Sequence, residues 1–367
     1  MSVTAIDVVG CGVFSPAGSG LAPLAAALAG PVSAPPAVPE GPDAPGGEGF
    51  PGAGARAVTD FRPAERLGNK GLSRLTRTDQ LGMVACGQAL EQLGRPLADE
   101  DRPRTGIVLG SGAGSVRRLA EFTRDTFVQD RPYMVNPSHF PGTLMNSAAG
   151  QTAIRFGITG VNATLAGGPV AGLSALRYAR NTLLNDHADR LLAGSVEELS
   201  AQSAWAWERT GRLSPGIGVG EGGAVFVLER DAERPLARLL ACELRFSAPG
   251  QGAAGIGRRL ADAVRDALKA SDVAAGDVGV VAVGGAGRRG WSAVEERALR
   301  EVFDGPGPER LRVQPVVGET HSAAASLQLA GLLARWQAEA ADADERVGLV
   351  TALGPDGQVG CLVVQRG

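Results

Sequence analysis

The stretch that decides the fold is Gly160-Val161-Asn162-Ala163-Thr164-Leu165-Ala166-Gly167-Gly168-Pro169-Val170-Ala171-Gly172-Leu173. Its first, apolar part predicts a buried strand, and residues 170–184 carry apolar side chains at helical spacing. A strand, a glycine-rich turn and a buried helix often present a nucleophile at the helix N-terminus, where free amides and the helix dipole favour a thiolate or an oxyanion. Pro169 occupies that place and has neither a nucleophilic atom nor an N–H group, although it suits a first helical position. The sequence therefore predicts the scaffold of a catalytic turn without its chemistry.

Patterns of buried strands alternate with amphipathic helices along the rest of the chain. Residues 105–109 predict a strand with a glycine-rich end, and a helix is expected over residues 115–127. From about residue 236 the same order of elements repeats in outline. This alternation predicts an α/β fold with two similar halves. We place the N-terminal half at residues 1–235 and the C-terminal half at residues 236–367.

Composition excludes several classes of partner. The 367 residues are 44% hydrophobic and 20% charged, with a net charge of −3, so neither nucleic acid nor an anionic membrane is expected as a partner. No apolar run reaches the ~18–20 residues of a membrane span and no secretory leader pattern is present, so a cytoplasmic location is expected. Residues 31–57, dense in Pro, Gly and Ala, predict a long surface loop.

The cysteines and histidines form no pattern typical of a metal site. The four cysteines are scattered, with no CxxC pair and no histidine at ligand spacing, and are expected to be small buried hydrophobes: Cys11, Cys86, Cys242 and Cys361. No metal and no cofactor are therefore predicted.

Four further segments, by their order and spacing over nearly the whole chain, resemble the β-ketoacyl synthases of fatty acid and polyketide synthesis. They are an opening strand and turn, a segment before a long helix, a dimer-contact loop and helix, and a Gly-Glu-Gly turn: residues 8–16, 60–81, 136–150 and 218–224. The resemblance implies a thiolase-like fold of αβαβα layers with two similar halves.

Such synthases use a Cys that takes an acyl group from a carrier protein, and two His that stabilise the enolate formed when malonyl-carrier decarboxylates. Placed on that pattern, the Cys falls on Pro169, the first His on Gly284 and the second His on Glu319. His321 lies two residues beyond the second His position. A lysine of the family is matched by Gln314, and its Phe-containing gate by residues 353–357, which contain no Phe.

The loss of all three catalytic groups resembles the chain length factor, or ketosynthase β subunit, of a type II polyketide synthase. The resemblance implies a heterodimer with an active ketosynthase α subunit and access to acyl carrier protein through that complex. Many factors of aromatic systems have Gln in place of the Cys. Pro169 departs from this, which favours a reducing, polyene-forming system.

The resemblance also assigns two sets of non-catalytic residues. On the helix over residues 115–127, bulky side chains are expected to line the partner's tunnel, although packing in the chain's own core explains the same pattern: Val116, Arg118, Leu119 and Phe122. The residues expected at the partner interface lie in the following loop and helix and in the strand before Pro169: Tyr133, Met134, Met145, Asn162 and Thr164. The strand is expected to pair with its counterpart across the dimer axis.

Two alternative functions stay open. One is an enzyme of altered chemistry, a malonyl-carrier decarboxylase or an acyltransferase, that uses Glu319, His321 or a serine. Glu319 can serve such an enzyme as a general base, or it can be structural and bind neighbouring amides or an arginine. The other is a homodimeric scaffold without a tunnel.

Overall fold

A computed structural model describes residues 4–31, 50–51, 54–339 and 346–367 of the chain. Most of the surface loop expected over residues 31–57 lies outside the described residues. None of the helices in the described ranges combines the length and the apolar character that crossing a bilayer needs.

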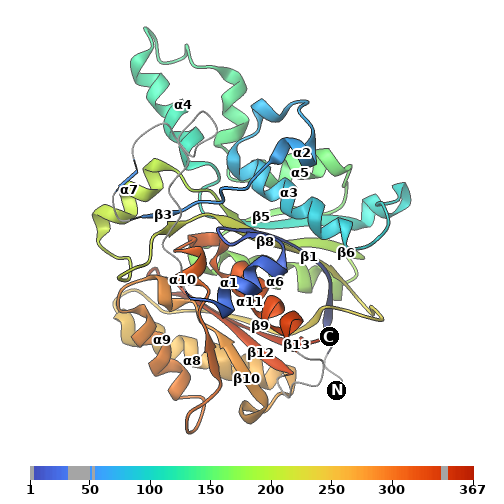
Figure 1. Ribbon diagram of the computed structural model, residues 1–367, viewed down its shortest axis with the longest axis vertical. Coiled ribbons are helices and arrows are strands. Elements are labelled where there is room, and N and C mark those ends of the chain that lie inside the picture. Colours follow the sequence, from blue (N-terminus) through green and yellow to red (C-terminus); the bar gives the residue numbers. More distant parts are fainter. Residues whose placement is uncertain (1–3, 32–49, 52–53, 340–345) are drawn as a thin grey trace.

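The backbone is organised around a continuous mixed sheet whose second half repeats the strand order of the first (Figure 1). The first half consists of β5 (Asn162–Ala166), β4 (Thr105–Ser111), β6 (Arg190–Glu197), β8 (Gly222–Glu229) and β1 (Ile6–Ser15). The second consists of β11 (Glu309–Leu311), β10 (Val278–Ala282), β12 (Val347–Leu353), β13 (Gln358–Arg366) and β9 (Ala237–Phe246).

The pairing directions of the two halves also agree. In each half the two pairs nearest the outer edge are parallel and the next two are antiparallel. The halves join where β1 pairs with β9, through Ile6 to Leu239 and Val8 to Ala237. The sheet thus confirms the expected α/β fold with two similar halves.

Helices cover both faces of each half and produce the layered arrangement (Figure 1). The middle layer contains α6 (Ala171–Leu184) and α11 (Ala324–Ala338). The outer layers contain α3 (Arg77–Glu91) and α5 (Ser147–Phe156) on the first half, and α8 (Gly252–Ser271) and α9 (Trp291–Arg300) on the second. The remaining short elements are α1 (Leu21–Ala29), α2 (Pro63–Leu67), α7 (Ala201–Thr210), α10 (Gln314–Val317), β2 (Gly18–Ser19), β3 (Ala55–Arg56) and β7 (Val219–Gly220).

Small residues allow the two central helices to lie close together. A Cβ atom added at Gly172 of α6 would lie 2.8 Å from the Oγ atoms of both Ser195 and Ser326. These two hydroxyls are themselves hydrogen-bonded at 2.7 Å in the buried core. Gly172 is therefore required by the close packing of α6 against α11 and β6.

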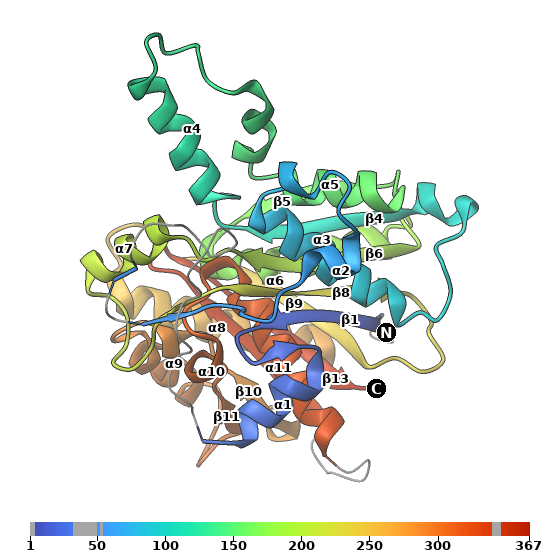
Figure 2. The ribbon, with the colours of Figure 1, turned by 45° about the horizontal axis from the view of Figure 1, so that its top comes forward.

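The helix α4 (Val116–Val128) and the 3₁₀ segment Pro137–Thr143 project from the body as an arm, which we define as residues 116–143 (Figure 2). No residue of α4 is buried. Phe127 and Tyr133 are 83% and 69% exposed. Exposed aromatic groups of this size on an extended arm are typical of a surface that a partner covers.

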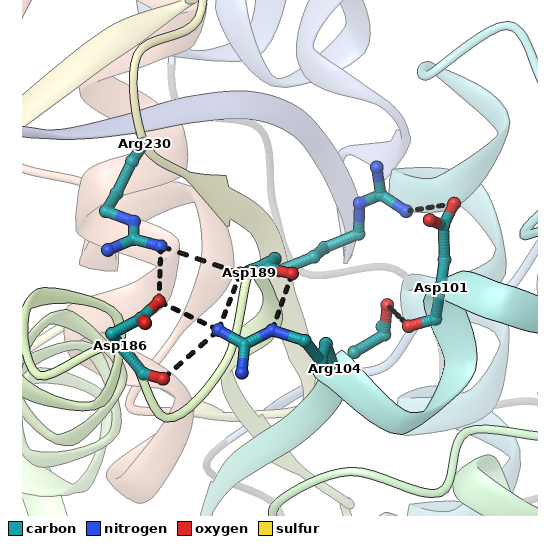
Figure 3. Close-up of polar contacts among 7 residues, drawn as sticks. Asp101, Arg104, Asp186, Asp189 and Arg230 are labelled. Carbon is teal, nitrogen blue, oxygen red and sulfur yellow. Dashed lines mark hydrogen bonds and ion pairs between the residues drawn. The ribbon is translucent and has the colours of Figure 1, made fainter.

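A network of charged side chains joins the amino ends of β4 and β6, at the opposite ends of these strands from Pro169 (Figure 3). Arg104 donates to Asp189 at 2.7 Å and to Asp186 at 2.8 Å, and Arg230 donates to Asp186 at 2.9 Å. Hydrogen bonds from these arginines lower the pKa of both carboxyl groups. The side chains are 32–70% exposed, so the network contributes little to stability.

Candidate functional site

Pro169 lies in a buried 3₁₀ turn, Gly168–Val170, between β5 and α6. The sequence predicts a helix-start proline, and Pro169 stands in the first turn of this short 3₁₀ helix, which leads directly into α6 at Ala171. Gly168 before it has a φ of +50°, in the left-handed region that favours glycine. The turn therefore presents no nucleophile and no amide N–H at position 169.

His321 is the side chain that lies against this turn. A Cβ atom added at Gly168 would be 3.4 Å from its Nε2 atom. His321 has a φ of +44°, in the left-handed region that side chains other than glycine seldom occupy. Its ring meets Trp207 edge-on, with centroids 6.2 Å apart, and its side chain is 37% exposed. His321, which the sequence places two residues beyond Glu319, thus lies next to the Pro169 turn.

Glu197 orients His321 and could not be identified from the sequence. The Nδ1 atom of His321 lies 3.7 Å from Glu197 Oε2, and Ser322 Oγ donates to the same carboxylate. A Cβ atom at Gly112 would lie 2.8 Å from that carboxylate, which explains a glycine at the end of β4. Burial alone lowers the pKa of His321, but the Glu197 carboxylate and the charge of Glu319 outweigh it and raise this pKa above its usual value.

Glu319 is engaged with a buried arginine. Its Oε2 atom lies 3.4 Å from Arg288 Nε, and its Oε1 atom accepts the backbone N–H of His321 at 2.9 Å. The two side chains are 2% and 3% exposed. Arg288 also donates to the carbonyl of Leu353 at 2.6 Å, at the start of the segment matched to the family's gate. These are the contacts of a carboxylate that holds a turn and neutralises an arginine.

Gly284 follows β10 in a turn that leaves no room for a side chain. A Cβ atom there would lie 2.6 Å from the carbonyl oxygen of Thr351, a backbone atom that cannot move alone. Glu295 accepts the N–H groups of Gly284 and Gly285 at 2.9 and 2.7 Å and the hydroxyl of Thr351 at 2.7 Å. Burial raises the pKa of Glu295, and these three hydrogen bonds oppose that rise. Gln314, at the family's lysine position, likewise binds the backbone, because its side-chain amide donates to the carbonyl of Val283 at 2.8 Å.

Cysteine chemistry is also excluded from the neighbourhood of Pro169. All four cysteines are buried and free, and burial raises the pKa of each thiol, to about 12 for Cys242. Cys242 contacts α6, and its Sγ atom donates to the carbonyl of Leu173 at 3.6 Å. A thiol with such a pKa supplies no thiolate near neutral pH.

The residues assigned to the tunnel lie on α4, away from the Pro169 turn. Arg118 pairs with Glu121 at 3.3 Å and lines a cavity of about 560 Å³ whose walls come from α2, α3, α4 and the end of β6. Leu119 is 43% exposed, Val116 is half-buried, and the Phe122 ring packs on Phe140 with centroids 6.1 Å apart.

The residues assigned to the partner interface are divided between the arm, the turn before α5, and β5. Tyr133, Met134 and Met145 are 69%, 55% and 44% exposed. Asn162 and Thr164 lie on β5, the outermost strand of the first half, which among the described strands pairs with β4 alone. None of these side chains is part of the Glu197–His321 cluster, so the residues assigned to the partner interface lie apart from that cluster.

Comparison with known proteins agrees with the layered fold described above. The family model described as Beta-ketoacyl synthase, N-terminal domain, matches residues 4–234. A Streptomyces virginiae relative named as polyketide beta-ketoacyl synthase 2 is 29% identical over 77% of this chain and 75% of its own length. A 3-oxoacyl-[acyl-carrier-protein] synthase 2 of Coxiella burnetii is 29% identical, but the match spans 41% of this chain and 36% of that protein.

Among solved structures, "The ishigamide ketosynthase/chain length factor" superimposes with a TM-score of 0.80 at 30% identity. It covers 99% of this chain and 99% of that one. The layered fold, the matched family model and this full-length similarity lead to one conclusion: the chain belongs to the β-ketoacyl synthase family.

Proposed function

We propose that the chain is a chain length factor, the non-catalytic subunit that pairs with an active ketosynthase and shapes its polyketide tunnel. The observation that carries this proposal is Pro169, which removes the nucleophile and an amide donor from the central turn. The other two catalytic positions support it. Gly284 has no space for an imidazole, and Glu319 is committed to Arg288.

The edges of the sheet support association through the first half. The outermost strand there, β5, is partly exposed, and Ile154 on the adjacent α5 is 77% exposed. The equivalent edge of the second half, β11, has three residues and is protected by ion pairs of Arg310 with Glu296 and Arg335 with Glu309. Charged side chains at an edge oppose pairing with another strand, so β5 and the arm are the surface for the ketosynthase.

The arm then supplies the tunnel wall. Phe122 and its neighbours on α4 would face the growing chain in the partner, and acyl carrier protein would reach the complex through the ketosynthase. A tunnel that ends early leaves each further methylene unburied, at about 0.8 kcal/mol per CH₂, so a few such groups stop elongation. Pro169 in place of Gln favours a product of a reducing, polyene-forming system.

Replacing Phe122 tests the tunnel directly. In the reconstituted complex with ketosynthase and acyl carrier protein, Phe122→Ala is expected to lengthen the products. The substitution removes a bulky ring from the tunnel wall and does not remove a catalytic group. Phe127→Ala is the matched control, since Phe127 lies on the same helix but is 83% exposed. Product chain length by mass spectrometry is the readout. Unchanged products for Phe122→Ala would remove Phe122 from the tunnel wall, and equal lengthening for both variants would show that the effect is not specific to its position.

A second candidate function rests on the pair of His321 and Glu197 beside the Pro169 turn. A carboxylate-oriented imidazole is a general base, so the chain can be tested as a malonyl-carrier decarboxylase or an acyltransferase. The assay is loss of carrier-bound malonate with the purified chain, compared with His321→Gln and Glu319→Gln. Turnover that depends on His321 would favour this function over the chain length factor.

A further inference from the structure

A groove between α8 and α9 opens on the outer face of the second half. Its volume is about 450 Å³. Small residues line it, with the buried Gly257 at its floor and the exposed Ala253 and Ala293 beside it, and three arginines lie along it: Arg258 from α8 and Arg297 and Arg300 from α9. None of these groups belongs to the site at Pro169 or to the arm.

The three arginines differ from their neighbours in having no acidic partner. Within the described residues no ion pair involves Arg258, Arg297 or Arg300, and all three are exposed. The adjacent arginines are paired, as Arg259 and Arg265 are with Asp262 at 3.4 and 3.3 Å. The one carboxylate in the groove, that of Glu301, lies 3.9 Å from Arg265. The groove therefore has an excess of uncompensated positive charge on a chain whose net charge is −3.

The shape of the groove suits a helix. A Cβ atom at Gly257 would be 3.4 Å from Val294 Cγ1, so the two helices are close at the floor and no large side chain fills the space above it. Arg297 and Arg300 are three residues apart on α9 and thus share one face. They place two guanidinium groups along the groove, where acidic residues one turn apart on a facing helix would meet them.

We propose that this groove binds an acidic helix of a partner protein. Charge complementarity selects the partner, and the small-residue floor allows its backbone to approach. The helices α8 and α9 lie at the opposite end of the molecule from the arm (Figure 1), so an occupant of the groove would leave the β5 edge and α4 free. The proposal is independent of the chain length function, because it uses no residue of the tunnel or of the Pro169 turn.

A synthetic helical peptide tests the groove without knowledge of the natural partner. The probe is an alanine-rich helix with Glu at positions i, i+3 and i+7, and its counterpart carries Gln at the same positions. Fluorescence anisotropy is expected to show binding of the Glu peptide alone, weakening as salt rises. The double variant R297E/R300E is expected to lower the affinity on the order of tenfold or more. R259E, a charge reversal on α8 outside the groove, is expected to leave it unchanged.

Several outcomes would overturn the proposal. They are no binding of the Glu peptide, equal binding of the Gln peptide, an unaffected R297E/R300E variant, or equal loss in R259E. The alternative role of Arg297 and Arg300 is to stabilise the C-terminal end of α9 through its dipole. In that case R297E/R300E would lower the melting temperature while leaving peptide affinity as in the wild type.

Discussion

Pro169 removes two catalytic elements with one side chain. Thioester chemistry at a helix N-terminus needs an attacking atom and amide donors for the oxyanion, and proline provides neither. The surrounding residues have taken other roles, since Glu319 neutralises Arg288 and the backbone at Gly284 lies against Thr351. On the proposed assignment of the catalytic positions, ketosynthase chemistry would therefore be prevented by the backbone as well as by the side chains.

Restoring the family's catalytic residues is expected to fail. The triple variant P169C/G284H/E319H places an imidazole at Gly284 against a carbonyl 2.6 Å from its Cβ atom and leaves Arg288 without its carboxylate. Overpacking of this kind costs ~1–3 kcal/mol, and an unpaired buried charge costs ~3–5 kcal/mol. We expect a lower unfolding free energy by denaturant titration and no condensation of acyl- and malonyl-carrier. Turnover by this variant would show that the scaffold is still catalytic.

His321 is expected to make stability depend on pH. Its pKa is raised in the folded chain by Glu197 and Glu319, against the opposing effects of burial and of Arg288. Stabilisation by the charged ring is then complete below the unfolded pKa of ~6.5 and disappears as the pH rises through the higher folded value. The difference in unfolding free energy between wild type and His321→Gln should therefore be larger at pH 5.5 than at pH 8.5. An equal difference at both values would show that the ring is not charged in the fold.

The sequence predicts part of this site, and the fold supplies the rest. Pro169, Gly284 and Glu319 could be placed by motif spacing, and their assignment to the catalytic positions stays a prediction. Glu197 and Arg288 could not be found, because one ends β6 and the other follows β10, and they meet His321 and Glu319 only through the fold. The one signal for Glu197 was a carboxylate at the end of a buried strand.

At the scale of elements, the strand–turn–helix around Pro169 was predictable and β9 was not. The expectation that β5 is buried was wrong, because it is the outermost strand and is partly exposed. Apolar residues at period two or near four identify β5 and α6, whereas β9 carries Arg238, Glu243 and Arg245 among its apolar residues. Glu243 and Arg245 lie toward the partly exposed end of β9, and Arg238 pairs with Asp7 at 3.3 Å. The helix α4 was predicted within one residue of its observed bounds, but core packing within the chain does not hold it, since none of its residues is buried.

Glu198 fixes the base of the arm. Its carboxylate accepts the hydroxyls of Ser115 and Thr78 at 2.8 and 2.9 Å and the N–H groups of Arg117 and Thr78, each at 3.2 Å. Burial raises the pKa of Glu198, and these hydrogen bonds oppose that rise. The carboxylate thus links the first turns of α3 and α4.

Removing that carboxylate is expected to loosen the arm. Glu198→Ala leaves several donors without an acceptor, at ~1–3 kcal/mol for each group that stays buried. Hydrogen exchange should become faster in residues 116–128 while α11 stays protected. Thr123→Ala, at an exposed position of α4, is the control. Unchanged exchange in α4 of the Glu198→Ala chain would show that the arm is held elsewhere.

The whole molecule consists of two halves with the same topology and different outer edges. Repetition of element order was visible in the sequence, and the division at residue 235 stays a proposal about folding units. What the sequence could not provide is the contrast between the apolar edge at β5 and the charged edge at β11. That contrast depends on ion pairs between residues of different elements, such as Arg335 with Glu309.

A charge on the first-half surface is expected to block association. Ile154→Glu should weaken binding to the ketosynthase on the order of tenfold or more, because the carboxylate would be buried without a partner. The stability of the isolated chain should change by less than ~0.5 kcal/mol, since Ile154 is 77% exposed. Phe246→Glu, at a 55% exposed position in the second half, is the matched control for co-purification. Loss of binding in the control alone would move the interface to the other half.

The most direct test of the central claim is intact-protein mass spectrometry of the purified chain and of its complex with ketosynthase, after incubation with acyl- and malonyl-carrier. The account predicts an acyl adduct and condensed product only when ketosynthase is present, with the adduct on ketosynthase alone. An acyl adduct on this chain, or condensation by the chain by itself, would contradict it.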